Sequence, residues 1–258
     1  MSKKIDEITV HVLTSDEEVG RGAAEDFVTH LTAVLKVKDE ASIILATGNS
    51  QLTFFEALRG RNDIAWNKIN LFHMDEYLGI SDQHTASFPR YIREKLTDHV
   101  HPKVFYPMDG RVLDVAAELK RYAELIRNHP TDICVLGIGE NCHVAFNDPP
   151  ADFQTINLIH LVNLDERCRM QQVNEGHFPT LEDVPKRAIT LTIPALLNAK
   201  HVLAVVPEIR KAEAVKAALE GPLTPDCPAS ILRTRSNVTM YLDQDSASKL
   251  IWFNSNRA

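Results

Sequence analysis

The chain has 258 residues, enough for one large domain or two small ones, and its 44% hydrophobic and 24% charged residues are typical of a globular protein. A net charge of −7 disfavours nucleic acid as a partner, because neutralising phosphates requires a basic face. The first residues lack the apolar core of a signal peptide, and no apolar run of about 18 residues occurs, so we expect a cytoplasmic protein without a membrane partner. Four cysteines without a CxxC pair predict free thiols and not disulfides or a zinc knuckle.

The first half of the chain alternates predicted strands with predicted helices. Ser15 and Glu18 have the spacing of a helix capping box, and apolar residues then recur at helical spacing from Val19 to Leu35. Short apolar runs predict strands at Ile8–Leu13, Ile43–Ala46, Ile69–Met74, Val104–Tyr106 and 132–138. Further helices are expected after Ser50, at 86–97 and at Val112–Ile126.

The pattern loosens after residue 150. The segment 151–186 holds one apolar run, 156–162, and a polar stretch, and we interpret it as a long functional loop or lid. Strands are expected again at Ile189–Ile193, Val202–Val206 and Val238–Leu242, with helices at Glu208–Leu219 and at the C-terminus. Because no repeat or linker interrupts the alternation, we predict a single domain over residues 1–258. Its fold class is α/β, a doubly wound, mostly parallel sheet with helices on both faces (a Rossmann-like three-layer sandwich).

Polar clusters follow three predicted strands, and parallel strands end at one edge of a sheet. The first, Thr47-Gly48-Asn49-Ser50, leads into a helix whose free backbone N–H groups suit an anion, although no Walker A sequence follows. A plain turn capped by Ser50 is the alternative. The second is Asp75-Glu76, of which we expect only one side chain to face a site, since adjacent residues point in different directions.

The third cluster follows the strand at 132–138. Gly137 and Gly139 end this strand, and Gly-x-Gly does not continue as a dinucleotide fingerprint. The groups that follow suit proton transfer, with a surface turn as the alternative; they are Glu140, Asn141, His143, Asn147 and Asp148. A nucleophilic Cys142 is disfavoured because a lone cysteine is more often inert. A metal site is also disfavoured, because HExxH and ligand spacing are absent.

Lys211 opens the helix after another strand. Its ammonium group is suited to bind a phosphate as a point charge, and a solvated helical lysine is the alternative.

Together these motifs resemble the glucosamine-6-phosphate deaminase/isomerase family, which shares its fold with the 6-phosphogluconolactonases. The resemblance covers nearly the whole chain. It rests on Ala46-Thr47-Gly48-Asn49-Ser50, Met74-Asp75-Glu76-Tyr77, Gly137 through Pro149, and Lys211.

The resemblance implies a role for each motif and no metal ion or organic cofactor. The phosphate of a hexosamine phosphate binds at Thr47–Ser50 and Lys211, with Gly137 and Gly139 also in the substrate site. His143 moves a proton at the ring oxygen to open the pyranose, and Asp75 transfers the C2 proton to C1. The products are fructose 6-phosphate and ammonia. Such enzymes are often homo-oligomers.

The chain departs from the family pattern near the imidazole. Asn141 and Asp148 stand where well-known deaminases have Asp and Glu, and Cys142 replaces a glycine at a position where the backbone favours positive φ. We expect Asn141 to orient the imidazole through its amide oxygen. For the phosphate-binding arginine, Arg167 and Arg169 are candidates, although an ungapped comparison places Gln172 there.

Two other functions share this fold, and the substrate remains open between glucosamine and galactosamine 6-phosphates. A lactonase is disfavoured because Val144-Ala145-Phe146-Asn147-Asp148-Pro149 differs from the Thr-Ala-Ser-Leu-Phe-Pro usual there. A non-catalytic sugar-phosphate sensor normally adds a DNA-binding helix-turn-helix, for which we expect no room before Ile8.

Overall fold

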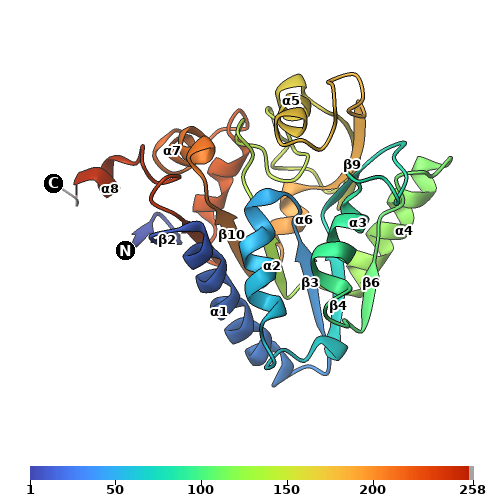
Figure 1. The fold of residues 1–258 in the computed structure, drawn as a ribbon, viewed down its shortest axis with the longest axis horizontal. Helices are drawn as coiled ribbons and strands as arrows, with labels where there is room; N and C mark the ends of the chain where they lie inside the picture. Colours follow the sequence, from blue (N-terminus) through green and yellow to red (C-terminus); the bar gives the residue numbers. More distant parts are fainter. Residues whose placement is uncertain (256–258) are drawn as a thin grey trace.

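The structure of the protein is a computed structural model, in which residues 1–255 are described. Its centre is an eight-stranded sheet with helices on both faces (Figure 1). In spatial order the strands are β1 (Ser2–Ile5), β2 (Ile8–Val12), β11 (Val238–Leu242), β10 (His201–Val206), β7 (Ile133–Leu136), β3 (Ala41–Leu45), β4 (Ile69–His73) and β6 (Val104–Tyr106). All neighbours pair in parallel except β1 with β2. The predicted doubly wound, mostly parallel sheet is confirmed.

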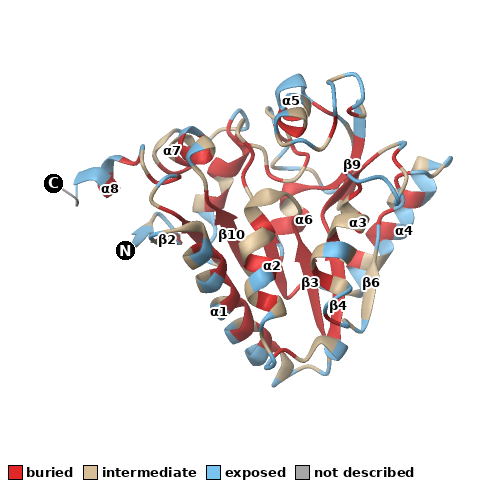
Figure 2. Cartoon of the chain, in the orientation of Figure 1, coloured by how far each residue is buried: buried red, intermediate tan, exposed pale blue. Residues whose placement is uncertain are grey.

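The central strands are apolar because both of their faces are covered. Ile43 of β3 packs with α1 (Asp16–Leu35) and α2 (Leu52–Arg59), whereas Ile44 packs on the opposite face with α4 (Val115–Asn128) and α7 (Ala212–Glu220). Figure 2 shows these strands buried between helices whose outer faces are exposed. The remaining α-helices are α3 (Phe88–Ile92), α5 (Glu166–Asn174), α6 (Ile193–Leu197) and α8 (Ile251–Ser255). Short 3₁₀ helices are η1 (Asn49–Gln51), η2 (Trp66–Lys68), η4 (Ile209–Lys211) and η5 (Pro228–Thr234), and η3 (Arg93–Thr97) is a π-helix that continues α3.

The segment 151–186, interpreted from sequence as a long functional loop or lid, contains two regular elements and is otherwise irregular. It contains β8 (Ile159–Asn163) and α5, and β8 joins β9 (Arg187–Leu191) and β5 (Asp75–Tyr77) in a second, antiparallel sheet. A separate apolar cluster that includes Tyr77, Phe146 and Cys168 packs this region together. The sequence did not predict this sheet, because β5 is three residues long and α5 has little amphipathic character.

The strand order reverses between β3 and β7. From β3 the chain proceeds outward to β4 and β6, and it then returns to β7 on the other side of β3 and continues to β10 and β11. The loops after β3 and β7 therefore diverge and leave a crevice at the carboxyl edge of the sheet. In Figure 1, α5 lies above this edge.

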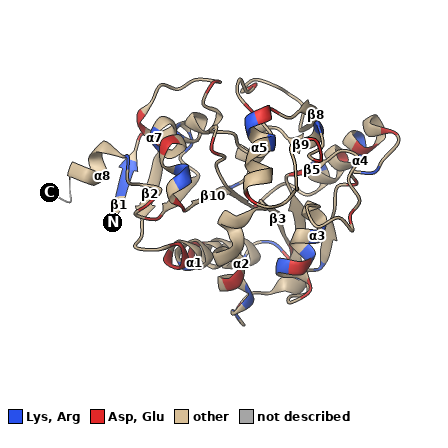
Figure 3. Ribbon diagram, turned by 45° about the horizontal axis from the view of Figure 1, so that its top comes forward, with Lys and Arg blue, Asp and Glu red and all other residues tan. Residues whose placement is uncertain are grey.

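Two further features concern the ends and the surface. β1 was not predicted, because it is an exposed edge strand with two lysines in four residues. No helix within residues 1–255 is long and apolar enough to span a membrane. Lys and Arg are interspersed with Asp and Glu on α3, α5 and α7 in Figure 3, and no basic face is seen in that view.

A glycine at position 20 allows α1 to pack closely on α2, the helix that follows the first polar cluster. A Cβ at Gly20 would lie 2.4 Å from the backbone carbonyl carbon of Thr53, whereas one at Gly22 would lie 3.1 Å from the flexible Cδ1 of Leu13. We expect Gly20→Ala to lower the free energy of unfolding by about 2 kcal/mol, because the two backbones must separate. Gly22→Ala, the matched control in the same helix, is expected to be neutral or stabilising. Urea unfolding measures both, and equal effects would refute this account.

Candidate active site

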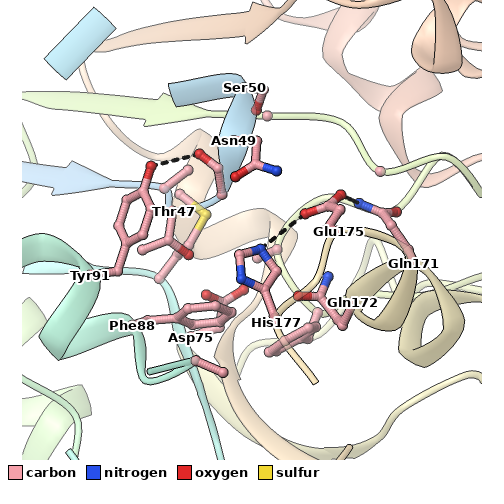
Figure 4. Close-up of a pocket in the computed structure, with 18 of the residues that line it drawn as sticks. Thr47, Asn49, Ser50, Asp75, Phe88, Tyr91, Gln171, Gln172, Glu175 and His177 are labelled. Carbon is pink, nitrogen blue, oxygen red and sulfur yellow. Dashed lines mark hydrogen bonds and ion pairs between the residues drawn. The ribbon is translucent and has the colours of Figure 1, made fainter. Parts of the chain in front are cut away.

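A cavity of about 330 Å³ lies at the carboxyl edge of the sheet, where β3, β4, β7 and β10 end. Its wall includes residues from all three predicted clusters. Figure 4 shows members of the first two clusters together with residues of α5 and of the segment that follows it. In the figure Thr47, Asn49 and Ser50 lie opposite Gln172 and His177, with Asp75 below them. The crevice predicted by the strand order is therefore a real cavity.

The first cluster forms a turn with backbone N–H groups at the start of α2. Gly48 has φ +101°, a conformation that L side chains rarely adopt, and its carbonyl accepts a 2.7 Å hydrogen bond from the Tyr91 hydroxyl. Gly137 lies directly opposite, since a Cβ there would come within 3.4 Å of Ser50 Oγ. The turn, the following η1 and the positive end of the helix dipole favour an anion such as phosphate.

Lys211 adds a positive charge to the same cavity. Its side chain is 4% exposed, and burial lowers its pKa, with the neighbouring Arg210 charge acting in the same direction. Within residues 1–255 no carboxylate or carbonyl lies within hydrogen-bonding or ion-pair distance of its ammonium group. Arg210, by contrast, pairs with Glu175 and Glu208. Among the described residues that line the cavity, Lys211 and Lys95 are the lysines without an ion pair, and Lys211 is the buried one.

Asp75 is the acid of the predicted pair that faces the cavity. It is 6% exposed, and burial raises its pKa to about 8, against a smaller lowering by a hydrogen bond from the Phe146 backbone. Glu76 points elsewhere, because its carboxylate accepts 2.8 Å hydrogen bonds from the Ser87 hydroxyl and the Tyr77 N–H. The expectation that only one of the two acids faces a site is confirmed.

His143 also lines the cavity, and its position depends on Gly139. A Cβ at Gly139 would lie 2.2 Å from the imidazole, so only glycine leaves room for the ring. The Nδ1 atom lies 3.3 Å from Asp148 Oδ1. Burial alone raises the pKa of Asp148, but the contacts with His143, Asn141 and the Asp165 N–H outweigh it and lower the pKa below its ordinary value. Asp148 therefore remains a carboxylate beside the imidazole.

Asn141 does not act as the sequence suggested. Its amide oxygen accepts a hydrogen bond from the His143 backbone N–H (3.2 Å), not from the ring, and its NH₂ group donates to Asp148 Oδ1 (3.0 Å). Asn141 therefore holds the carboxylate that lies beside the imidazole and does not contact the ring itself. Sequence alone could not distinguish these arrangements, because they differ in one side-chain rotation.

The loop that carries these groups contains a residue with a strained backbone and a side chain that holds the loop in place. Cys142 has φ +70°, so the prediction of a positive φ at this former glycine position is confirmed. Its thiol packs against the Ala214 carbonyl. Asn147, one of the predicted polar groups, donates to the carbonyls of Val144 and Leu191 and so braces the loop.

The cavity unites most of the predicted residues. They are Thr47, Gly48, Asn49, Ser50, Asp75, Gly137, Gly139, His143 and Lys211. Arg167 does not line it, whereas Gln172 does. The sequence analysis did not identify four other residues that line the cavity, Tyr91, Glu175, His177 and Arg210. Only Arg210 could have been found from sequence, because it is the neighbour of Lys211. A possible metal-ligand group, His143, Asp148 and Cys168, also comes together beside the cavity.

An anion-binding turn, a buried lysine, a basic carboxylate and an imidazole around one cavity define an acid/base site for a small anionic substrate. The model of the family described as glucosamine-6-phosphate isomerases/6-phosphogluconolactonase matches residues 14–241, and the chain belongs to this family.

Similar proteins agree with this membership. The glucosamine-6-phosphate deaminase of Exiguobacterium sibiricum is 38% identical over 217 residues, which cover 84% of each chain. That of Streptococcus suis is 35% identical over 242 residues, 94% of this chain and 99% of the other. The solved structure of a monomeric glucosamine-6-phosphate deaminase has a TM-score of 0.85 at 31% identity, covering 93% of this chain and 99% of the other. A Thermotoga maritima 6-phosphogluconolactonase (TM-score 0.74, 21% identity, 92% and 99% covered) shares the fold.

The raised pKa of Asp75 has a consequence for stability. Because the folded-state pKa (about 8) exceeds the ordinary value of 3.8, the folded protein holds this proton more tightly than the unfolded chain. The resulting stabilisation is complete below pH 3.8 and is lost as the pH rises to about 8. Asp75→Asn removes this loss, so at pH 9 the variant should exceed the wild type in free energy of unfolding by more than about 1 kcal/mol. Near pH 4 the two should be similar.

Urea unfolding at both pH values measures the difference. Asp98→Asn, at an exposed carboxyl, is the control and should show no such pH-dependent gain. An equal difference between Asp75→Asn and wild type at the two pH values would contradict the raised pKa.

Proposed function

We propose that the protein is an amino-sugar-phosphate deaminase/isomerase that converts glucosamine 6-phosphate, or its galactosamine isomer, to the ketose 6-phosphate and ammonia. The observation that carries the proposal is that Asp75 and His143 face one cavity together with the turn Thr47–Ser50 and Lys211. The names of the similar deaminases support it. The likeness to lactonases, at 21% identity, concerns the fold alone and does not favour hydrolysis of a lactone.

Substrate binding begins at the phosphate. The backbone N–H groups of the turn and the ammonium group of Lys211 bind it at the carboxyl ends of β3 and β10. This contact fixes one end of a six-carbon sugar, and the opposite end, with C1 and C2, extends toward Asp75 and His143. Positioning of this kind makes a large contribution to the rate.

The chemistry then needs two proton-transfer groups. His143 takes the proton of the anomeric hydroxyl and returns a proton to the ring oxygen, so the C1–O5 bond breaks and the open aldehyde forms. The carboxylate of Asp148 stabilises the imidazolium that exists between these transfers.

Asp75 performs the isomerisation. Its carboxylate takes the C2 proton to give a 2-amino-enol, and it returns the proton to C1 to give an imine at C2. Water adds to this carbon, and ammonia leaves. Burial makes Asp75 a stronger base than an exposed carboxylate, which suits removal of a carbon-bound proton, and the positive charge of the bound amine favours its ionised form.

Ammonia release tests the proposal. Incubation with glucosamine 6-phosphate and, in parallel, galactosamine 6-phosphate should give ammonia and a ketose 6-phosphate from one of them. Asp75→Asn should lower kcat by at least about a hundredfold while sugar-phosphate binding persists, because it removes the base and keeps the shape. Substrate deuterated at C2 should carry part of that deuterium to C1 of the product, because the same carboxyl group removes the proton and returns it.

Other outcomes identify the alternatives. Binding without ammonia release would indicate a sugar-phosphate sensor, and hydrolysis of 6-phosphogluconolactone would indicate a lactonase. Near-normal turnover by Asp75→Asn would show that another group is the base.

Lys211 provides a separate prediction. Lys211→Ala should raise KM at least about tenfold and change kcat less, because a charge-assisted contact to phosphate is made before and during the reaction. Lys216→Ala, in α7, the helix directly after Lys211, but away from the cavity, is the control. A fall in kcat at unchanged KM would contradict phosphate binding by Lys211.

A further inference from the structure

Three side chains beside the active site form a potential metal-ligand cluster. Two of them take part in the proposed reaction, but that reaction uses no metal ion. His143 and Asp148 come from the loop after β7, and Cys168 comes from α5. One ligand atom from each of these side chains lies within 4.8 Å of the other two. These residues are five and twenty positions apart along the chain, which is why sequence spacing did not indicate them.

We propose that His143, Asp148 and Cys168 bind a Zn²⁺ ion, and that this ion inhibits the enzyme. Imidazole nitrogen, carboxylate oxygen and thiolate sulfur are the donors that Zn²⁺ prefers. Two N or O ligands of a tetrahedral zinc lie about 3.3 Å apart, given metal–ligand distances of about 2.0–2.1 Å. The His143 Nδ1–Asp148 Oδ1 distance is 3.3 Å. When the ion binds, the Cys168 sulfur would move to roughly 3.5 Å from each of these two ligand atoms.

The groups around two of the proposed ligands leave them suitably placed to bind a metal ion. Asp148 Oδ1 accepts from Asn141 Nδ2 and Oδ2 accepts from the Asp165 N–H, both at 3.0 Å, so outer contacts already fix the carboxylate. His143 Nδ1 is buried and makes no well-aligned hydrogen bond within residues 1–255. Its nitrogen and the carboxylate therefore face one another without a well-aligned hydrogen bond between them.

The third ligand supplies selectivity for a thiophilic ion. Cys168 is 1% exposed and packs in the apolar cluster beneath α5. Burial keeps its pKa well above the ordinary value, so the free protein has a thiol there. When Zn²⁺ binds, the S–Zn bond replaces the S–H bond and the proton leaves to solvent. Three protein ligands leave a fourth position for water.

The inhibition is inferred from the different roles of the two nitrogens of the His143 ring, and this inference rests on the proposed function. A metal at Nδ1 takes the lone pair of that nitrogen, so the neutral ring must carry its proton on Nε2. Nε2 can then donate a proton but cannot accept one, whereas ring opening requires both steps. The bound ion thus removes the base needed to open the sugar and leaves the phosphate site intact.

Direct binding tests the site without reference to activity. The full chain without a histidine tag should bind one Zn²⁺ in equilibrium dialysis, and Co²⁺ in its place should give a thiolate-to-cobalt charge-transfer band. Cys168→Ser should weaken Zn²⁺ binding at least tenfold and abolish the band. Cys227→Ser is the matched control, because Cys227 is another buried thiol, next to Cys142 and outside the cluster, and it should retain both.

Several results would overturn the proposal. They are equal Zn²⁺ affinity in Cys168→Ser and wild type, loss of binding in Cys227→Ser instead, and a cobalt spectrum without the thiolate band. Asp148→Asn should also weaken Zn²⁺ binding, which covers the case in which Cys168→Ser fails to fold.

A separate experiment tests the effect of Zn²⁺ on activity. Zn²⁺ should lower kcat for ammonia release in wild type and Cys227→Ser at concentrations that do not affect Cys168→Ser. Binding without inhibition would refute the inhibitory role. An enzyme that releases no ammonia even without Zn²⁺ would refute the proposed function and leave the binding result valid.

Discussion

The reversal of strand order between β3 and β7 is the constraint on which the site depends. Neighbouring parallel strands whose loops leave in opposite directions cannot close over their own carboxyl ends, so a crevice must remain. Both strands are buried on both faces, which leaves their ends as the places where polar groups can meet solvent. Thr47–Ser50 and Gly137–His143 therefore face one another although some ninety residues separate them. The second sheet and α5 cover this crevice and turn it into a cavity.

Burial determines what the cavity can do. Asp75 and Glu76 are adjacent, and burial raises the pKa of both to about 8, yet their surroundings give them different parts. Glu76 is held by Ser87 and Tyr77 and ties β5 to the chain before α3. Asp75 has the cavity in front of it. Asp148 shows the opposite case, because several donors keep a buried carboxylate ionised beside an imidazole. A single region thus holds both a strong base and a permanent negative charge.

Sequence predicted the parts that depend on local pattern. Apolar runs located the strands, and the residues after them included Asp75, His143 and Lys211, because strand ends are set by where burial stops. The groups it missed depend on tertiary contacts. Glu175 and His177 enter the cavity only because α5 packs on the second sheet through Cys168, and α5 itself has no clear amphipathic pattern. The contact of Asn141 with Asp148 likewise depends on a loop conformation that includes two non-glycine residues with positive φ, Cys142 and Ala145.

The backbone at Cys142 also bears on how this chain can change. A left-handed conformation costs a residue with a Cβ about 1 kcal/mol relative to glycine. The sulfur offsets part of this by packing against Ala214 and Cys227 in the core. Position 142 is therefore subject to two opposed physical requirements: the backbone conformation favours glycine, and the core favours a side chain that fills it. Codons for cysteine and glycine differ by a single base. One mutation would therefore exchange the filled core for an unstrained loop, immediately beside the imidazole that this loop carries.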